Sequence, residues 1–422
     1  MAVLNGKHIV LGITGSIAAF KAAELASQLA QQAVELDVIL TSAAEKFITP
    51  LTLQSVTGRH AFTEADLWGG EAHVLHVGLS HSADLLVIAP CTANTIASLA
   101  HGRADNLLTI TALAARCPLL VAPAMDGGML DHPATQANLD ILIRRGAYIA
   151  GPAEGHLASG LLGKGRLIEP SELIGHIRLV LGRKGALAHR KIVISAGGTQ
   201  EPLDPVRVLT NRSSGRQAYA LAQAAIDAGA DVTLVSAPTA LTPPVGARLV
   251  PVQTARDMLE AVLHEASGSD ALIMAAAVAD FRPRHAASDK LKSRDGVPHI
   301  ELEATQDILK VVAAARRAPE LGSPSRTASH DAGIPADFVP PHVVVGFAAE
   351  SRDLLDNAVE KLKAKSLNFI VANDITQADA GFGASTNRVT IISENGDREP
   401  LPLLSKAEVA DAIVERIAGL LE

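Results

Sequence analysis

Short apolar runs alternate with amphipathic stretches along the whole chain, and this alternation constrains the fold more than any other feature of the sequence. In the first half the apolar runs are bounded by turn residues and read HIVLGITG, LDVILT, DLLVIAP, PLLVAPA and AYIAG. The stretches between them, such as IAAFKAAELASQLAQQA, place apolar residues at helical spacing. Strands that alternate with helices indicate βαβ units, which build a parallel sheet. We therefore expect an α/β fold.

The same pattern starts again near the middle of the chain. KIVISAGG at Lys191 corresponds to HIVLGITG, and DALIMAAAVAD corresponds to DLLVIAP. The sequence thus predicts two doubly wound, Rossmann-like α/β domains with mainly parallel sheets, over residues 1–185 and 190–422. A stretch rich in Pro, Ser and Ala, about residues 317–340, is expected to be an exposed insertion in the second domain.

Charge and composition argue against several classes of partner. The formal net charge is −8, no lysine- and arginine-rich block occurs, and aromatic residues make up 3%, whereas nucleic-acid binding needs a basic surface and usually stacking aromatics. No apolar run reaches the ~18 residues that a membrane helix needs. Cys91 and Cys117 lie outside any CxxC or Cys/His spacing typical of zinc. Because the first residues lead straight into a strand pattern, we expect no signal peptide, no nucleic-acid or membrane partner, and a reduced, cytoplasmic protein.

Loops that follow predicted strands are the candidate sites, because ligands of open α/β sheets bind beyond the carboxyl ends of the strands. GITGSIAAFK, Gly12 to Lys21, follows the first strand and opens a helix. Its glycines allow a tight turn, and Ser16 with the first helix amides offers donors to an anion. The spacing is not GxGxxG, which favours a mononucleotide phosphate over a dinucleotide. A plain strand–helix turn with a serine cap explains the motif equally well.

Three further stretches of the first half carry polar groups. His76 is one of three histidines before the DLLVIAP strand; it is either a general base beside a ligand loop or a surface histidine. Asp126 stands at the apex of APAMDGGML, where Asp-Gly-Gly is also ordinary turn chemistry. Residues 155–167, GHLASGLLGKGRL, hold so much glycine that a loop is expected, with Ser159 inside it.

In the second half, the loop after the first strand has the composition of an anion site. AGGTQEPLDPVRVLTNRSSG, residues 196–215, supplies Arg207 and Asn211 and leads into a helix. AAAVADF ends a later strand with Asp280, a usual place for a carboxylate that binds a metal or acts as a base. SDKLKS places Lys290 in a loop just beyond.

Taken in order, these motifs resemble one family, the bifunctional phosphopantothenoylcysteine decarboxylase/phosphopantothenate–cysteine ligases of bacterial coenzyme A synthesis. AGGTQEPLDPVR, TNRSSG, AAVADF, KLK, GFAAES and VAND are similar to the ligase half, and GITGSIAAFK, HVGLSHSADLLVIAP, PAMD and ASGLLGKGRL to the flavoprotein half. The resemblance covers nearly the whole chain. It implies a ligase that uses CTP and Mg²⁺ and a decarboxylase that uses FMN, with 4′-phosphopantothenate and cysteine as substrates.

In the ligase half, the resemblance implies that the pantothenate carboxylate attacks the α-phosphate of CTP and that the cysteine amine then displaces CMP from the acyl-cytidylate. Carried onto matching positions, Asn211 is a catalytic residue that holds the acyl-cytidylate, and Arg207 binds the substrate with it. Lys290 neutralises phosphate charge, and Asp280 contacts cytosine or the metal-bound triphosphate. The other implied CTP contacts are Phe347, Lys361 and Lys365.

In the flavoprotein half, the resemblance implies that flavin oxidises the cysteine thiol, that the carboxylate is then lost, and that the resulting enethiol is reduced back. His76 matches the family's active-site histidine, and Asp126 and Ser159 occupy two further catalytic positions. The implied FMN-binding residues are Gly15, Ser16, Thr41, Ser42, Thr92, Ala93 and Asn94.

Two of these positions depart from the family pattern. The resemblance implies a proton-donating cysteine in a substrate lid where this chain has Ser159, and a hydroxyl is a far weaker acid than a thiol with a pKa near ~8.5. His156 is the nearby side chain that could substitute. The family has asparagine at Asp126, where a carboxylate offers only acceptors and repels the carboxylate of the substrate. We therefore expect an active ligase joined to a flavin-binding domain whose decarboxylation is lost, stalled after oxidation or redirected.

Other classes fit the sequence less well. A nicotinamide-dependent dehydrogenase would need GxGxxG or Tyr-x-x-x-Lys, and a P-loop kinase GxxxxGK[ST], and none of these occurs. A flavin domain that serves only in assembly stays open as an alternative. The resemblance implies a homo-oligomer, with trimers of the flavin domain, dimers of the ligase domain and an assembly of up to a dodecamer.

Overall fold

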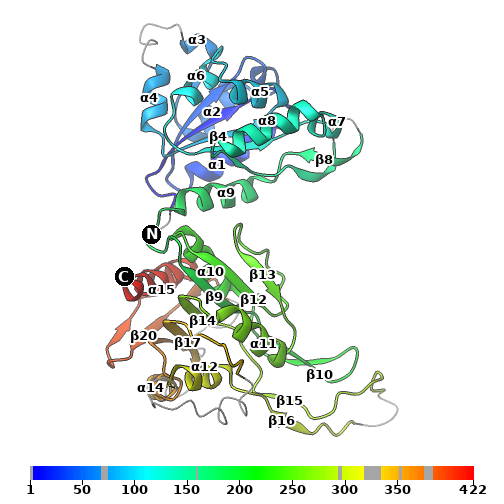
Figure 1. Ribbon diagram of the computed structural model, residues 1–422, viewed down its shortest axis with the longest axis vertical. Helices are drawn as coiled ribbons and strands as arrows, with labels where there is room; N and C mark the ends of the chain where they lie inside the picture. The colour runs from blue at the N-terminus through cyan, green and yellow to red at the C-terminus, as the bar shows by residue number, and fades with distance from the viewer. Residues whose placement is uncertain are drawn as a thin grey trace. The chain divides into compact units, whose positions relative to one another are not determined.

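The computed structural model describes residues 3–67, 75–157, 160–292, 297–317, 334–350, 354–374 and 384–422. The chain forms two compact units, one ending at Gly182 and the other beginning at Arg183 (Figure 1). Most of the stretch expected to be an insertion, residues 318–333, lies outside the described residues. None of the helices within the described ranges is both long and apolar enough to cross a membrane.

The N-terminal unit is built on a six-stranded sheet in the order β3-β2-β1-β4-β5-β6, in which every pair is parallel. The strand order reverses between β1 and β4, as in doubly wound folds. The strands are β1 His8–Ile13, β2 Glu35–Leu40, β3 Ala61–Phe62, β4 Leu85–Cys91, β5 Leu119–Pro123 and β6 Tyr148–Ile149. The helices are α1 Phe20–Ala30, α2 Pro50–Thr57, α3 Glu64–Leu67, α4 Leu75–Ser82, α5 Ala93–His101, α6 Leu107–Ala114, α7 Gly127–Leu130, α8 Pro133–Arg144 and α9 Pro170–Gly182, with short 3₁₀ turns at Ile17–Ala19 and Ala44–Lys46.

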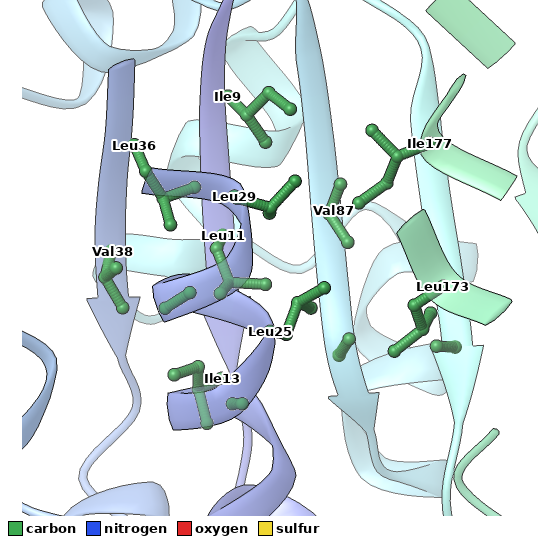
Figure 2. Close-up of a cluster of buried hydrophobic side chains, with 14 of the residues drawn as sticks. Ile9, Leu11, Ile13, Leu25, Leu29, Leu36, Val38, Val87, Leu173 and Ile177 are labelled. Carbon is green, nitrogen blue, oxygen red and sulfur yellow. The ribbon is translucent and has the colours of Figure 1, made fainter. Parts of the chain in front are cut away.

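Both faces of this sheet are buried, which explains why its strands read as continuous apolar runs. Figure 2 shows Ile9, Leu11 and Ile13 of β1 in one cluster with residues of α1 and α9. The alternate residue Val10 belongs to the cluster on the other face, with α5, α6 and α8. Each such side chain gains about 1.5–3 kcal/mol when fully buried.

The C-terminal unit contains an eight-stranded sheet in the order β13-β12-β9-β14-β17-β18-β20-β21. Strands β13 to β18 pair in parallel, and β20 and β21 add an antiparallel edge. The order reverses between β9 and β14. The strands are β9 Lys191–Ala196, β12 Asp231–Ser236, β13 Arg248–Pro251, β14 Ala271–Met274, β17 Val343–Glu350, β18 Phe369–Asp374, β20 Val389–Ser393 and β21 Arg398–Pro400. The prediction of two doubly wound α/β domains with mainly parallel sheets is confirmed.

Helices cover both faces of the second sheet as well. One buried cluster joins α11, α12 and α14 to alternate residues of the strands, among them Leu272 and Val344. The intervening residues, such as Ile273, point to the opposite face, and α10 and α15 pack against each other and against strands of the sheet. The helices are α10 Arg216–Asp227, α11 Ala255–Ala266, α12 Ile308–Arg317, α14 Leu354–Ala364 and α15 Lys406–Leu421.

Four two-stranded ribbons lie outside the main sheets. They pair β7 Ala153–His156 with β8 Leu162–Arg166, β10 Gln200–Pro202 with β11 Val208–Thr210, β15 Phe281–Pro283 with β16 Leu302–Ala304, and β19 Thr386–Asn387 with β22 Leu404–Ser405. Figure 1 shows β10 and the β15–β16 ribbon at one edge of the C-terminal unit. The prediction of a loop over residues 155–167 is wrong at its flanks, because the β7–β8 hairpin pairs them. Gly155, Gly163 and Gly165 lie in the two strands of this exposed ribbon, where few side chains need to be packed.

Candidate functional site

The N-terminal unit has its candidate site where the strand order reverses, at the carboxyl ends of β1 and β4. Thr14 ties the two loops together, since its Oγ1 donates to Pro90 O at 2.7 Å and accepts from Thr92 N at 3.0 Å. Ser16 Oγ accepts from Ala18 N and caps the turn that leads into α1. Thr92 caps α5 in the same way through Thr95 N. Two helical segments therefore begin side by side at this edge, where an anion is favoured.

Gly15 is required by a close approach of the next loop. A Cβ at this position would lie 2.4 Å from the Cβ of Ala43, which follows β2. The neighbouring Thr41 Oγ1 contacts Ile13 O at 3.3 Å and accepts from Ala44 N at 3.3 Å. The hydroxyl of Thr41 thus organises the β2 loop that packs on Gly15.

A cavity of about 480 Å³ opens beside these loops. Gly15, Ser16, Thr92 and Asp126 line it, and so does His156. Its apolar lining includes Ile17, Phe20, Met125 and Met129. The structure does not bring five other predicted residues to its wall, namely Thr41, Ser42, His76, Ala93 and Asn94. Ser159 lies outside the described residues.

Asp126 and the β7–β8 hairpin form one wall of this cavity. Met125 N donates to Gly165 O at 2.9 Å, and a Cβ on Gly165 would lie 2.2 Å from Met125 O. Asp126 Oδ1 accepts from Gly128 N at 3.0 Å and caps the short helix α7. The turn expected from Asp-Gly-Gly is therefore present, and its carboxylate stands on the cavity wall.

Lys21 is a residue whose place the sequence reasoning missed. Its side chain is buried, lines the cavity, and donates from Nζ to Leu167 O and Glu169 Oε1, both at 2.9 Å. The hydrogen bond from Lys21 lowers the pKa of the Glu169 carboxyl. A lysine on the apolar face of the predicted first helix was the signal that could have found this contact.

His76 lies near the start of α4, next to residues 68–74, which are outside the described ranges. Its Nδ1 is buried, and within the described residues it has no hydrogen-bond partner. A buried polar nitrogen in this state costs free energy unless a partner is supplied.

The C-terminal unit has a second cavity, of about 330 Å³, at the carboxyl edge of its own sheet. Four of the residues predicted to contact a nucleotide line it: Asp280, Phe347, Lys361 and Lys365. They come from the segment after β14, from β17, from α14 and from the position directly after α14. Residues some 80 positions apart in the chain therefore meet at one reversal point of the sheet.

Asn211 lies beside this cavity rather than in its wall. Its Nδ2 donates to Ala277 O at 3.3 Å and to Val278 O at 3.2 Å, and both of these residues line the cavity. Gly198, opposite Asn211, would bring a Cβ to 2.9 Å from Asn211 O. The loops after β9 and β14 are thereby held together.

Arg207 and Lys290 lie away from the cavity wall. Arg207 Nη1 donates to Asp204 Oδ2 at 3.1 Å and to Leu291 O at 3.0 Å, and Leu291 N donates to the same carboxylate oxygen. These bonds fasten the loop that carries Lys290 to the turn between β10 and β11. Lys290 itself is exposed.

Further polar residues of the cavity wall were not singled out from the sequence. Asp307 Oδ2 lies 3.2 Å from Lys365 Nζ, so the acid positions that lysine. Thr305 N donates to Asp280 O at 2.9 Å. Other residues of this kind are Arg216, Gln217, Gln306, Asn373, Asn387 and Lys406. Within the described residues, no group of three or more His, Cys, Asp or Glu side chains could hold a metal ion by itself.

The comparisons with known proteins agree with this architecture. Residues 2–181 match the family described as "Flavoprotein", and residues 187–321 and 336–421 match "DNA/pantothenate metabolism flavoprotein C-terminal domain". Fold and cavities therefore define a flavoprotein joined to a second domain of pantothenate metabolism.

Relatives along the full length make the assignment specific. The coenzyme A biosynthesis bifunctional protein CoaBC of Bacillus subtilis strain 168 is 41% identical over 99% of this chain and 98% of its own. That of Vibrio cholerae is 42% identical over 99% of both chains. A crystal structure of the C-terminal domain of a CoaBC protein is 38% identical, covers 56% of this chain and 98% of its own, and has a TM-score of 0.44.

The chain belongs to the family of coenzyme A biosynthesis bifunctional proteins. The resemblance drawn from the motifs is confirmed. The chain is thus an enzyme of coenzyme A synthesis, with a ligase half and a decarboxylase-type flavoprotein half. Family membership also decides against the dehydrogenase and kinase alternatives.

Proposed function

We propose that the C-terminal unit joins cysteine to 4′-phosphopantothenate at the expense of CTP, and that the N-terminal unit acts on the product with FMN. The observation that carries this proposal is the meeting of Asp280, Phe347, Lys361 and Lys365 around one cavity at the reversal point of the second sheet. Cationic and polar groups fixed by the fold are what phosphoryl transfer requires, since they stabilise charge without reorganising.

The ligase step uses the residues in distinct ways. The carboxylate of the substrate forms a bond to the α-phosphorus of CTP while the bond to pyrophosphate breaks, and the cysteine nitrogen then displaces CMP. Lys361 and Lys365 balance the phosphate charge, and Asn211 fixes the loop on which the acyl-cytidylate would lie. Lys290 and Arg207, on the loops beside the β10–β11 ribbon, would reach the substrate when these loops approach the cavity.

Magnesium fits this cavity only together with a nucleotide. Asp280 and Asp307 are the carboxylates of the described cavity wall, and Mg²⁺ in nucleotide sites is commonly held by one or two carboxylates plus phosphate oxygens and water. These two residues would therefore hold the ion against the phosphates, where it supplies charge neutralisation.

The N-terminal cavity fits FMN by the chemistry of its wall. Gly15, Ser16 and Thr92 present backbone amides and hydroxyls to a phosphate, and Ile17, Phe20 and Met129 give an apolar surface for a flat ring. When bound there, FMN supplies oxidation of the substrate thiol and the later reduction. Residues of the chain must position the thiol, bind the substrate carboxylate and provide a proton.

We propose that these last two tasks are impaired in this chain. Asp126 brings a carboxylate to the cavity wall where the family has an amide, and like charges repel at close range. Ser159 takes the place of an acidic thiol, which leaves His156 on the cavity wall as the nearest proton donor. A flavin unit that serves only in assembly is the alternative, and the two differ in whether the flavin turns over.

We further propose that the chain works as a cytoplasmic homo-oligomer, through trimers of the flavin unit and dimers of the ligase unit. Support comes from the family resemblance. Light scattering on the full-length protein tests it, because a monomer would contradict the proposal.

The ligase proposal is tested by incubating the protein with 4′-phosphopantothenate, cysteine, a nucleotide and Mg²⁺, and measuring phosphopantothenoylcysteine and pyrophosphate. We expect product with CTP, less with ATP, and none after the ion is removed with EDTA. Asp280→Asn should lower the rate strongly. Equal rates with CTP and ATP would overturn the choice of nucleotide, and no product with either would overturn ligation.

A further inference from the structure

The cavity of the C-terminal unit receives basic residues from both helical layers of that unit. Lys361 lies in α14 and Lys365 directly after its last residue, and α14 covers one face of the sheet, whereas Arg216 and Lys406 begin α10 and α15 on the other face. Lys365 is paired with Asp307 at 3.2 Å. The resemblance implies CTP contacts for Lys361 and Lys365, and it implies none for Arg216 and Lys406 at the starts of α10 and α15.

The backbone of Lys406 is fixed in place by its neighbours. Its N–H donates to Ser385 O at 3.1 Å, and its carbonyl accepts from Gln217 Nε2 at 3.1 Å. Asn387 Nδ2 donates to Gln217 Oε1 at 3.4 Å and lines the cavity as well. The start of α15 is therefore held at the cavity wall by side chains that themselves line it.

The charge of Lys406 is not balanced by the protein. Within the described part of the chain, its Nζ forms neither an ion pair nor a hydrogen bond. Its side chain is half-buried, and burial together with the nearby charge of Arg216 lowers its pKa. A lysine charge in such a partly buried position is costly unless an anion accompanies it.

The adjacent helix start leaves room for such an anion. α10 begins after Gly215, which has a φ of +73° and no side chain to cap the first amides. The first-turn residues Arg216, Gln217 and Ala218 all line the cavity. Uncapped amides at a helix N-terminus and unbalanced lysine charge favour the same ligand, an anion with several oxygens.

We propose that Lys406 binds a phosphate group of the nucleoside triphosphate in the ligase reaction, from the side opposite to Lys361 and Lys365. The inference rests on the proposed function, because it takes the cavity to be the nucleotide site. A triphosphate chain has enough oxygens to contact cations on both layers at once. Lys406 is thus a specificity-determining residue for the polyphosphate part of the nucleotide.

The test compares wild-type protein with Lys406→Met, Lys406→Arg and Lys363→Met, all as the full-length chain. Lys363 is an exposed lysine on α14 that does not line the cavity, so its variant is matched in charge change. We expect Lys406→Met to raise KM for CTP and the Kd for inorganic tripolyphosphate by about ten-fold or more, as for the loss of one charge-assisted hydrogen bond. Lys406→Arg should stay within about three-fold of wild type, because it retains the charge.

Calorimetric titration with tripolyphosphate gives a readout that does not depend on turnover. Unchanged tripolyphosphate and CTP affinity in Lys406→Met would overturn the inference, and so would a raised KM for 4′-phosphopantothenate in place of CTP. Thermal unfolding and the affinity of Lys406→Arg separate a binding defect from misfolding. If wild-type protein binds tripolyphosphate through Lys406 but makes no phosphopantothenoylcysteine, the proposed ligation fails while the phosphate site stands.

Discussion

The two cavities of this chain are built by the same topological rule but differ in how completely each unit assembles them. In the C-terminal unit, Asp280, Phe347, Lys361 and Lys365 converge on one cavity within the unit. In the N-terminal unit, Gly15, Ser16 and Thr92 line the cavity at the corner that we propose binds a phosphate, whereas His76 does not reach the cavity wall. A reversal of strand order therefore brings together the loops that follow the central strands. A residue outside those loops, such as His76, is not placed at the cavity by this reversal.

The two cavities also differ in their chemistry relative to the family pattern. By the resemblance, the ligase half keeps the family's residues at the predicted positions, whereas the sequence of the flavoprotein half has Asp126 and Ser159 where the family has asparagine and cysteine. Substitutions that restore the family residues of the flavin cavity should reduce this difference, and substitutions that damage the ligase cavity should show what each residue contributes.

Restoring both family residues should have the largest effect. Asp126→Asn with Ser159→Cys removes a repelling carboxylate and supplies an acidic thiol, and general acid catalysis is commonly worth ~10²–10⁴ in rate. We expect 4′-phosphopantetheine formation to rise about 100-fold or more, measured by mass spectrometry under anaerobic conditions. The ligation rate is the internal control and should not change. A double variant that is no faster than wild type would contradict the proposed impairment.

Damage to the ligase cavity should be nearly as severe. Asn211→Ala removes the amide that ties Ala277 and Val278 to the loop after β9, and we expect kcat/KM for ligation to fall about 10–100-fold, because the loop that positions the acyl-cytidylate is no longer fixed. The pyrophosphate release assay measures it. Asn395→Ala, in an exposed turn of the same unit, is the control. An equal loss of kcat/KM in both variants would mean that Asn211 has no specific role in ligation.

The phosphate corner of the flavin cavity can be tested by a steric exchange. Gly15→Ala places a methyl group 2.4 Å from Ala43 Cβ, so we expect a loss of about 1–3 kcal/mol in the free energy of unfolding and weaker flavin binding. Ala43→Gly in the same chain should restore much of both. Flavin fluorescence and thermal unfolding provide the measurements, with Gly78→Ala, where a Cβ meets open space, as control. Failure of the second substitution to rescue would mean that the glycine is needed for another reason.

The smallest effect expected concerns the contact that fastens α1 to the segment after the β7–β8 hairpin. Lys21→Met should lower the free energy of unfolding by about 0.5–1.5 kcal/mol, because Leu167 O and Glu169 lose their donor. Lys21 lowers the pKa of Glu169 from its ordinary value of 4.5, so this stabilisation is present above that pH and is lost as pH falls through the lowered pKa. Denaturant titrations of both proteins at several pH values should therefore converge in acid. A difference in the free energy of unfolding that does not change with pH would mean that Lys21 stabilises the unit by packing alone.

The fold was predictable from the sequence because both sheets are buried on two faces, so that runs such as HIVLGITG and KIVISAGG mark strands by hydrophobicity alone. The glycines that follow β1 and β9 marked the loops of the two cavities, because tight turns after strands favour glycine. The hairpin of residues 153–166 could not be predicted, because its glycine-rich strands have no alternation of apolar and polar residues.

Three polar residues of the two cavities could not be predicted from the sequence either. Lys21 and Lys406 belong to helices that read as ordinary amphipathic segments, and only tertiary packing shows that one is buried and that the other lines a cavity. Asp307 has no motif of its own and acquires a role from the nearby Lys365.

An intact ligase cavity and an altered flavin cavity in one chain are tested together by one anaerobic incubation of the purified protein with 4′-phosphopantothenate, cysteine, CTP and Mg²⁺, followed by mass spectrometry. We expect phosphopantothenoylcysteine, or its oxidised enethiol, to accumulate, with little 4′-phosphopantetheine. Rapid and complete conversion to 4′-phosphopantetheine would contradict it, since Ser159 and Asp126 would then support the full reaction.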